Sequence, residues 1–241
     1  MRIKSGLVIA ALFFLFASCR KIDEPIRFSV LGDSFSSFKG TVDPGTNDVW
    51  GWYSDIGVTY PEQIWWYKVA VNMQWVLEKN NSFAGSLICN LNVGGYYGPY
   101  SFLHRLSCLG DPDVIFVFGG TNDLWNDVPF GDFVYADWTE GQLCEIRPAL
   151  ACLFSSLKRG YPRAELYFLV DMDAGGGICD EDTKKVFVES VHQIANHYQV
   201  RCIDLLDIHK DWWHPNEEGQ DDIARQVTAV LQVDFNVENG I

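Results

Sequence analysis

Three short blocks of the sequence hold residue types that can carry out acyl transfer. The first is Gly32-Asp33-Ser34-Phe35-Ser36, in which the Ser34 hydroxyl becomes a nucleophile once a base removes its proton. A serine at a strand-to-helix turn also has a free backbone N–H, which can stabilise developing negative charge. Taken alone, this block is explained more simply by a serine that caps the start of a helix.

The other two blocks offer a hydrogen-bond donor and a base. In Gly119-Gly120-Thr121-Asn122-Asp123, the glycines permit a tight turn and Asn122 has a side-chain N–H₂ donor. In Asp211-Trp212-Trp213-His214-Pro215-Asn216, a carboxylate stands three residues before a histidine. Such a carboxylate can fix the histidine tautomer and stabilise its charged form. Each block alone is also typical of an ordinary polar turn or surface loop.

The elements that must position these blocks are short apolar runs that alternate with amphipathic stretches. Strands are expected at 26–31, 113–118, 166–170 and 200–206, with a weaker one near 75–78. Helices are expected at 64–73, 140–159, 181–197 and 217–231, with a kink or break at Pro148. The alternation predicts a single-domain, three-layer α/β/α (flavodoxin-like) fold with a central, mostly parallel sheet of about five strands. Ligands of such folds bind beyond the carboxyl ends of the strands, where all three blocks fall.

The three blocks together, in this order, resemble the sequence blocks of the SGNH (GDSL-type) hydrolase family. The family's second block, built around a glycine, is matched by Asn80-Asn81-Ser82-Phe83-Ala84-Gly85, and Gly219 falls where the family often has a glycine. The resemblance spans residues 26–231.

This resemblance implies a role for each site residue. Ser34 is the nucleophile, His214 the general base and Asp211 the carboxylate that orients it. The oxyanion hole is formed by the backbone N–H groups of Ser34 and Gly85 and by the side-chain amide of Asn122. The implied reaction proceeds through an acyl-enzyme and needs no metal or organic cofactor.

Asp33 and Asp123 are expected to hold their turns through backbone hydrogen bonds. Neither is expected to transfer a proton in the reaction. A G-x-S-x-G elbow is absent, which argues against the α/β-hydrolase type of serine esterase.

Aromatic residues near these blocks suggest a carbohydrate substrate, because sugar rings stack on aromatic faces. The alternative is that most of them are core residues. They are Trp50, Trp52, Tyr53, Tyr60, Trp65, Trp66, Tyr67, Tyr96, Tyr97, Tyr100, Trp125, Trp212 and Trp213. We therefore expect removal of acetyl or other short acyl groups from a glycan. A lysophospholipase or thioesterase is the alternative enzyme, and a non-catalytic glycan-binding lipoprotein is the alternative outside enzymes.

Length and charge agree with this class of protein. The chain has 241 residues and a formal net charge of −14. The length suits one α/β domain, and the acidic balance argues against nucleic-acid partners and against binding to an anionic membrane surface. The composition does not indicate an oligomeric state.

The first 18 residues are interpreted as a signal peptide. Arg2 and Lys4 precede an apolar run over 7–17, which is shorter than the ~20 residues that a membrane-spanning helix needs. The small residues before Cys19 resemble a bacterial lipobox, which implies lipidation of Cys19 and a short tether over 19–25. The hydrolase domain then covers 26–241, with an irregular, aromatic-rich insertion near 41–63. The chain is thus expected to be an exported lipoprotein facing the periplasm or cell surface, and an ordinary secretory signal is the alternative.

Six further cysteines follow, at 89, 108, 144, 152, 179 and 202. Some of them can pair in an oxidising compartment, but the sequence does not select among the pairings. The absence of a C-x-x-C pattern argues against a zinc knuckle or a thioredoxin-type site.

Overall fold

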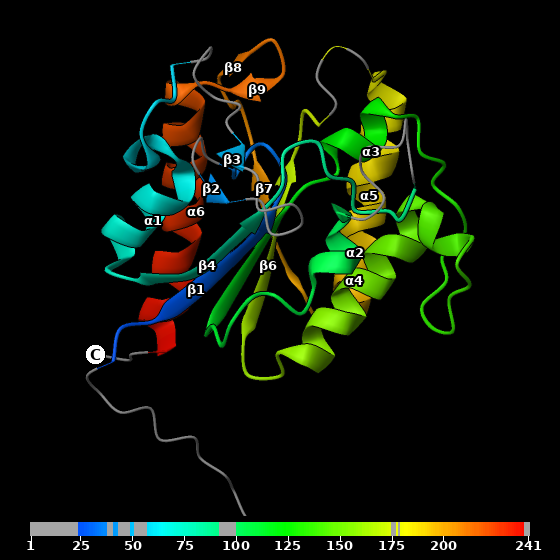
Figure 1. Cartoon of the computed structure of the whole chain (residues 1–241), viewed down its shortest axis with the longest axis horizontal. Helices are drawn as coiled ribbons and strands as arrows, with labels where there is room; N and C mark the ends of the chain where they lie inside the picture. The colour runs from blue at the N-terminus through cyan, green and yellow to red at the C-terminus, as the bar shows by residue number, and fades with distance from the viewer. Residues whose placement is uncertain are drawn as a thin grey trace, which may run out of the picture.

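A five-stranded parallel sheet forms the centre of the computed structural model, which describes residues 24–37, 41–42, 49–50, 57–91, 100–174, 177 and 179–238. The strand order is β4-β1-β5-β6-β7 (Figure 1). The strands are β1 (Arg27–Gly32), β4 (Val76–Ser82), β5 (Val114–Phe118), β6 (Glu165–Asp171) and β7 (Arg201–Leu205). This order is that of a flavodoxin-like, doubly wound sheet, as the sequence predicts.

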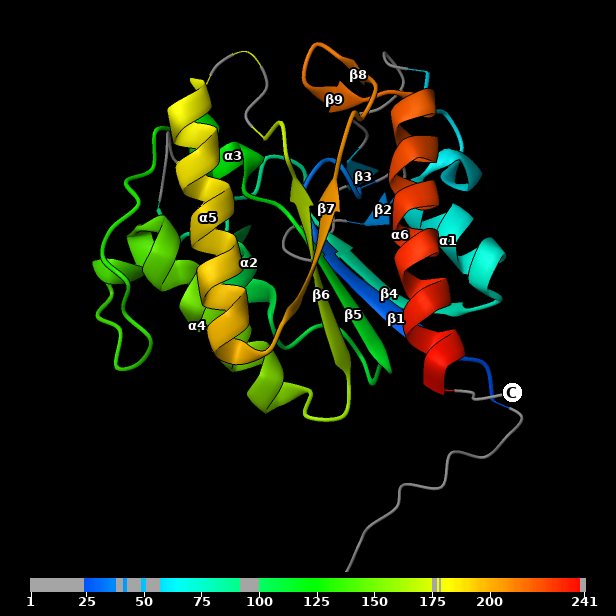
Figure 2. The same cartoon turned by 180° about the vertical axis from the view of Figure 1, so that it is seen from behind.

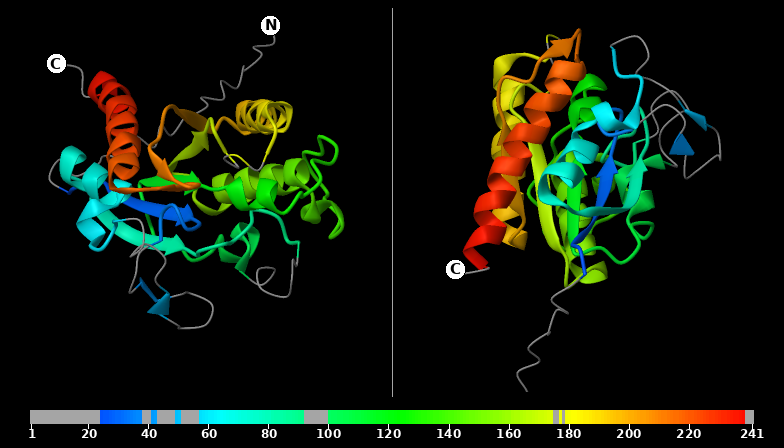
Figure 3. Two further views of the ribbon diagram at one scale, coloured as in Figure 1. Left: turned by 90° about the horizontal axis from the view of Figure 1, so that it is seen from above. Right: turned by 90° about the vertical axis from the view of Figure 1, so that its left-hand side faces the viewer.

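Helices cover both faces of the sheet and complete the three layers (Figures 1 and 2). One face is covered by α1 (Trp65–Met73) and α6 (Glu217–Glu238). The other is covered by α2 (Phe102–Arg105), α3 (Thr121–Trp125), α4 (Ile146–Gly160) and α5 (Glu181–Tyr198). The view from above in Figure 3 shows the sheet between these two helical layers.

The central strand, β5, is apolar along its whole length. Every residue of β5 is buried, because helices pack on both sides of it. Successive side chains of a strand point to opposite faces. Accordingly, Ile115 and Val117 pack with α4 and α5, whereas Phe116 packs with α1 and α6.

Several elements differ from the sequence-based expectation. Strand β4 continues to Ser82, because Asn80, Asn81 and Ser82 pair with the last residues of β1. The predicted kink at Pro148 is wrong. Helix α4 begins at Ile146, so Pro148 lies in the first turn, where a missing N–H breaks no helical hydrogen bond. The preceding residues form a separate 3₁₀ turn, η4 (Gln142–Cys144).

The short helices α2 and α3 were not predicted. In the part of the chain that the structure describes, two further pairs of short strands lie outside the main sheet. Strands β2 (Thr41–Val42) and β3 (Val49–Trp50) are antiparallel and fall in the expected insertion, which also contains the 3₁₀ turn η2 (Pro61–Gln63). Strands β8 (Lys210–Asp211) and β9 (His214–Pro215) form a hairpin just before α6.

The N-terminal predictions fall on residues that the structure does not describe. The signal peptide, Cys19 and most of the tether lie within residues 1–23, so their roles stay predictions. Among the described helices, none has both the length and the apolar character that a bilayer span requires. The six cysteines after Cys19 all lie in the described part of the chain, where they are free thiols.

Candidate active site

Ser34 lies in a tight turn directly after β1. The carbonyl of Asp33 accepts hydrogen bonds from the backbone N–H groups of Ser36 and Ser37, at 3.2 and 3.0 Å. The Asp33 carboxylate accepts a further bond from the N–H of Phe35, with 2.9 Å between Oδ1 and N. Asp33 therefore holds the turn, as expected, and presents Ser34 at the carboxyl end of the central sheet.

His214 reaches this turn from the β8–β9 hairpin, at the edge of the sheet where the strands end (Figures 1 and 2). Its Nε2 lies 2.9 Å from Oγ of Ser34. The ring of Phe35 packs edge-on against the imidazole, with 5.6 Å between ring centroids. The structure thus brings together two of the predicted catalytic residues, which stand 180 positions apart in the chain.

Burial sets the charge of His214. The side chain is buried, and loss of solvation lowers the pKa of the imidazole to about 4. At neutral pH the ring is therefore uncharged. A neutral imidazole at hydrogen-bond distance from a serine hydroxyl can accept its proton.

Asp211 has a different environment from His214. The two residues are paired directly across the hairpin. Asp211 is nevertheless exposed, and its Oδ1 accepts a hydrogen bond from Nδ2 of Asn216 at 3.2 Å. Its role as the carboxylate that orients His214 stays a prediction.

Gly85 lies in a turn that requires glycine. The N–H of Ser86 donates to the carbonyl of Phe83 at 3.2 Å, and Gly85 between them has a φ of 77°. This is the third position of a type II turn, which favours glycine because its φ is positive. The turn directly follows β4, so Gly85 and Ser34 come from neighbouring strands of the sheet.

Asn122 is in the first turn of α3, directly after β5 and Gly120. Its Nδ2 donates to Oδ2 of Asp33 at 3.2 Å and to the carbonyl oxygen of Ser86 at 3.1 Å. One amide thus links the turn of Ser34 to the turn of Gly85. Because Nδ2 already has two acceptors, a substrate oxyanion would have to share or replace one of them.

Buried carboxylates support these turns. Burial and the nearby charges of Asp123 and Asp171 raise the pKa of Asp33 to about 7, although the Phe35 N–H and Arg105 oppose the shift. The Asp123 carboxylate accepts hydrogen bonds from the N–H groups of Ile88 and Cys89, at 2.9 and 3.1 Å. Burial raises its pKa as well. Asp123 therefore fastens the loop after Gly85 to α3, in the structural role expected from the sequence.

Arg105 is a site neighbour that the sequence did not indicate. Its buried guanidinium donates to the carbonyl of Gly32 at 3.1 Å and to Oγ of Ser86 at 2.8 Å. It thus ties the end of β1 to the turn of Gly85. No motif surrounds Arg105, so only the tertiary contacts reveal it.

The aromatic residues divide between core and surface. Trp65 and Trp66 are buried against the sheet, so a sugar-stacking role is wrong for them. Trp212, at the tip of the β8–β9 hairpin, is 87% exposed. The ring centroids of Trp212 and Trp213 are 5.5 Å apart, and those of Trp213 and Trp125 are 4.2 Å apart. The side chains of Trp50, Trp52, Tyr53, Tyr96 and Tyr97 lie outside the described residues.

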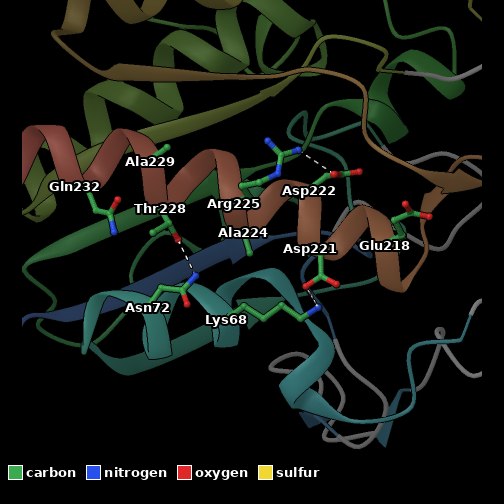
Figure 4. Close-up of a pocket in the computed structure, with 10 residues that line it drawn as sticks. All are labelled: Lys68, Asn72, Glu218, Asp221, Asp222, Ala224, Arg225, Thr228, Ala229 and Gln232. Atoms are coloured by element: carbon green, nitrogen blue, oxygen red, sulfur yellow. Dashed lines mark hydrogen bonds and ion pairs between the residues drawn. The ribbon is translucent and has the colours of Figure 1, made fainter.

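A separate groove of about 880 Å³ lies between α1 and α6 (Figure 4). It is spanned by the Lys68–Asp221 ion pair and by a 3.2 Å hydrogen bond from Asn72 to Thr228. None of its lining residues belongs to the motifs, so we assign it no part in the chemistry. Across the described ranges, no three His, Cys, Asp or Glu side chains are arranged to hold a metal ion.

Comparisons with known proteins agree with this geometry. The family model for GDSL-like lipases and acylhydrolases matches residues 26–231. A search of curated proteins found no significant match.

Among solved structures, a protein assigned as a GDSL-like lipase from Bacteroides ovatus is 38% identical, with a TM-score of 0.76 over 87% of this chain and 99% of its own. One from Bacteroides uniformis is 35% identical, with a TM-score of 0.77 over 87% and 97%. A family two carbohydrate esterase from Clostridium thermocellum, solved with cellohexaose, is 21% identical, with a TM-score of 0.58 over 88% and 66%, and shows the shared fold alone. The match of the family model to most of the chain shows that this protein belongs to the family of GDSL-like lipases and acylhydrolases.

Proposed function

We propose that this hydrolase cleaves carboxylic esters through an acyl-enzyme formed on Ser34. The single observation that carries the proposal is the 2.9 Å separation between Oγ of Ser34 and Nε2 of His214. A serine hydroxyl is a weak nucleophile until an adjacent base accepts its proton. The neutral, buried imidazole meets that requirement.

The reaction has two halves. As Oγ of Ser34 attacks the ester carbonyl, its proton passes to Nε2 of His214. The tetrahedral oxyanion is stabilised by the N–H groups of Ser34 and Gly85 and by the amide of Asn122. The imidazolium then protonates the leaving alcohol, which departs and leaves the acyl group on Ser34.

Water completes the second half. His214 accepts a proton from the water as its oxygen attacks the acyl-enzyme. The second tetrahedral intermediate then collapses, and the proton returns to Oγ of Ser34 while the carboxylic acid leaves. In both halves of the reaction, Asp211 is assigned the role of orienting the His214 imidazole.

The proposed substrate is a carbohydrate that carries acetyl or other short acyl groups. This part of the proposal is supported by Trp212, whose ring is 87% exposed only two residues from His214. An exposed indole in the hairpin that also carries His214 is suited to stack on the apolar face of a sugar ring, because one side of the indole is apolar and its N–H is polar.

The experiment measures hydrolysis of p-nitrophenyl esters from acetate to octanoate. We expect turnover of the acetate that Ser34→Ala abolishes, while Ser107→Ala, at an exposed serine outside the motifs, retains it. Wild-type turnover no faster than that of Ser34→Ala would favour a non-catalytic binder. A rate that climbs steeply toward octanoate would replace the acetylesterase with a lipase or thioesterase.

The carbohydrate part is tested separately with an acetylated polysaccharide. Trp212→Ala should raise KM for the polysaccharide and leave kcat/KM for p-nitrophenyl acetate unchanged, because the small ester does not reach the hairpin tip. Equal KM values for both proteins on the polysaccharide would remove the stacking role.

We also propose that the protein is exported and anchored by a lipid on Cys19. The support is the lipobox-like sequence alone. Labelling with palmitate in a bacterial host should mark the wild type, found in the membrane fraction, and not Cys19→Ser. An unlabelled, released wild type would indicate ordinary secretion.

A further inference from the structure

The hairpin that carries His214 is fastened to the sheet by a buried ion pair. Nζ of Lys210 lies 2.7 Å from Oδ2 of Asp171, and these side chains are only 8% and 4% exposed. The same nitrogen donates to the carbonyl of Asp173 at 3.1 Å. Lys210 is in β8, and Asp171 is the last residue of β6. The pair therefore joins the hairpin to the carboxyl edge of the sheet.

The hairpin needs such an attachment because its own ladder is very short. It contains two residue pairs, Lys210 with Pro215 and Asp211 with His214. A two-stranded hairpin of this kind is at best marginally stable by itself. Its position relative to Ser34 must therefore be set by contacts with the rest of the molecule.

Two polar contacts that attach this segment differ in burial, and the ring of Trp213 also packs on that of Trp125 in α3. His209 donates from its backbone N–H to Oδ2 of Asp222 at 3.2 Å, and its Nδ1 lies 2.6 Å from the same oxygen. The His209 side chain is 55% exposed, so solvent competes for this contact. The Lys210–Asp171 pair is screened far less, because both side chains are buried.

Lys210 is also linked to the reactive pair through an aromatic ring. Its Nζ lies 6.0 Å from the ring centroid of Phe35, and that ring lies 5.6 Å from the ring of His214. Phe35 directly follows Ser34 in the chain. The ring thus contacts both the anchoring lysine and the base while it shares the turn of the nucleophile.

We propose that the Lys210–Asp171 ion pair positions His214 against Ser34. Neither residue contacts the reacting atoms, so both are positioning residues and not catalytic ones. The proposal rests on the ester hydrolysis proposed above and extends it to two residues outside the motifs. If so, catalysis depends on this ion pair because the pair fixes the position of His214 relative to Ser34.

The test removes both charges together. Loss of one partner alone would leave an uncompensated buried charge and destabilise the fold, whereas replacement of a buried pair by apolar residues of similar volume is often neutral for stability. The variant is therefore Lys210→Met with Asp171→Leu. We expect a Tm close to that of the wild type, a KM for p-nitrophenyl acetate within about threefold, and a kcat lower by about 10- to 100-fold, because small misplacements have effects of this size.

The matched control is Lys184→Met. Lys184 is a largely buried lysine on α5 that also contacts Asp173, with Nζ 2.5 Å from Oδ1, but it does not touch the hairpin. This variant should keep the wild-type kcat. A wild-type kcat in the Lys210/Asp171 double variant, or an equal loss in Lys184→Met, would overturn the proposal.

A second measurement does not depend on activity. An NMR titration of His214 should show its pKa rising from about 4 toward the ordinary value of 6.5 in the double variant, because a loosened hairpin exposes the imidazole. The variant removes one positive and one negative charge, so the net charge of the protein is unchanged. A pKa that stays near 4 would contradict the positioning role. Absence of Ser34-dependent hydrolysis in the wild type would instead contradict the proposed function, and the titration would still test the ion pair.

Discussion

The side-chain amide of Asn122 donates to the carboxylate of Asp33, with Nδ2 3.2 Å from Oδ2. The same nitrogen lies 3.1 Å from the carbonyl oxygen of Ser86, the residue after Gly85. One side chain therefore connects the turns that contain Ser34 and Gly85. The loops that hold the three proposed oxyanion donors are thus linked before any substrate binds, and Nδ2 of Asn122 must share or give up one of its two acceptors when the oxyanion forms.

The pH dependence of hydrolysis should follow the low pKa of His214. Its imidazole must be neutral to accept a proton, and burial lowers its pKa to about 4. We therefore expect kcat/KM for p-nitrophenyl acetate to stay level from neutral pH down to about pH 5 and to fall below it. Because Asp33 also titrates, with a pKa of about 7, the same profile is measured in Asp33→Asn. An acid limb near pH 6.5 that persists in this variant would contradict the prediction.

Asp33→Asn should also change how stability depends on pH. The folded protein holds a proton on Asp33 up to about pH 7, whereas the ordinary pKa is 3.8. As pH rises from about 4 to 7, the unfolded chain loses this proton first, so the wild type loses stability, by up to about 4 kcal/mol. The asparagine does not titrate. Tm of the variant minus Tm of the wild type should therefore increase over this range and level off above it, and parallel Tm curves would be the contrary result.

Gly85→Ala should reduce both stability and activity. Gly85 has a φ of 77°, and a residue with a Cβ atom is strained in this region by about 1–2 kcal/mol. Relief of the strain would turn the backbone N–H away from the oxyanion. The kcat of the variant should therefore fall even at temperatures where the protein is fully folded. Gly141→Ala is the control, because a methyl group added at Gly141 would meet no other atom within 4 Å. Equal kcat values for both variants would argue against a Gly85 donor.

Asp211→Asn should have a smaller effect than Ser34→Ala. The Asp211 carboxylate is exposed and hydrogen-bonded to Asn216, so solvent screens its charge. We expect kcat to fall by no more than about tenfold, compared with about 10⁴-fold for a buried carboxylate of a catalytic triad. The measurement is kcat for p-nitrophenyl acetate, with unfolding followed in parallel. A loss near 10⁴-fold would show that Asp211 acts as a buried triad member does.

The elements that could be predicted from sequence are those with strong local patterns. The fully apolar run of β5 and the amphipathic spacing of α5 indicate their structures without any neighbour. The end of β4 could not be predicted, because Asn80, Asn81 and Ser82 are polar and become a strand by pairing with β1. Helix α3 was missed for a similar reason, since Gly119 and Gly120 precede it and five residues are too few to show a helical period.

The sequence by itself determined which residues stand at the carboxyl ends of successive strands, and parallel strands bring those ends to one edge of the sheet. That is why Ser34, Asn122 and His214 were expected at one edge of the sheet, whereas Gly85 was named only from the resemblance to the SGNH (GDSL-type) hydrolase family. Only the tertiary structure decided the 2.9 Å contact between Ser34 and His214, the burial that neutralises the imidazole, and the Lys210–Asp171 pair that fastens its hairpin. These features arise from contacts between residues far apart in the chain, and burial depends on everything packed around a side chain, which no local pattern contains.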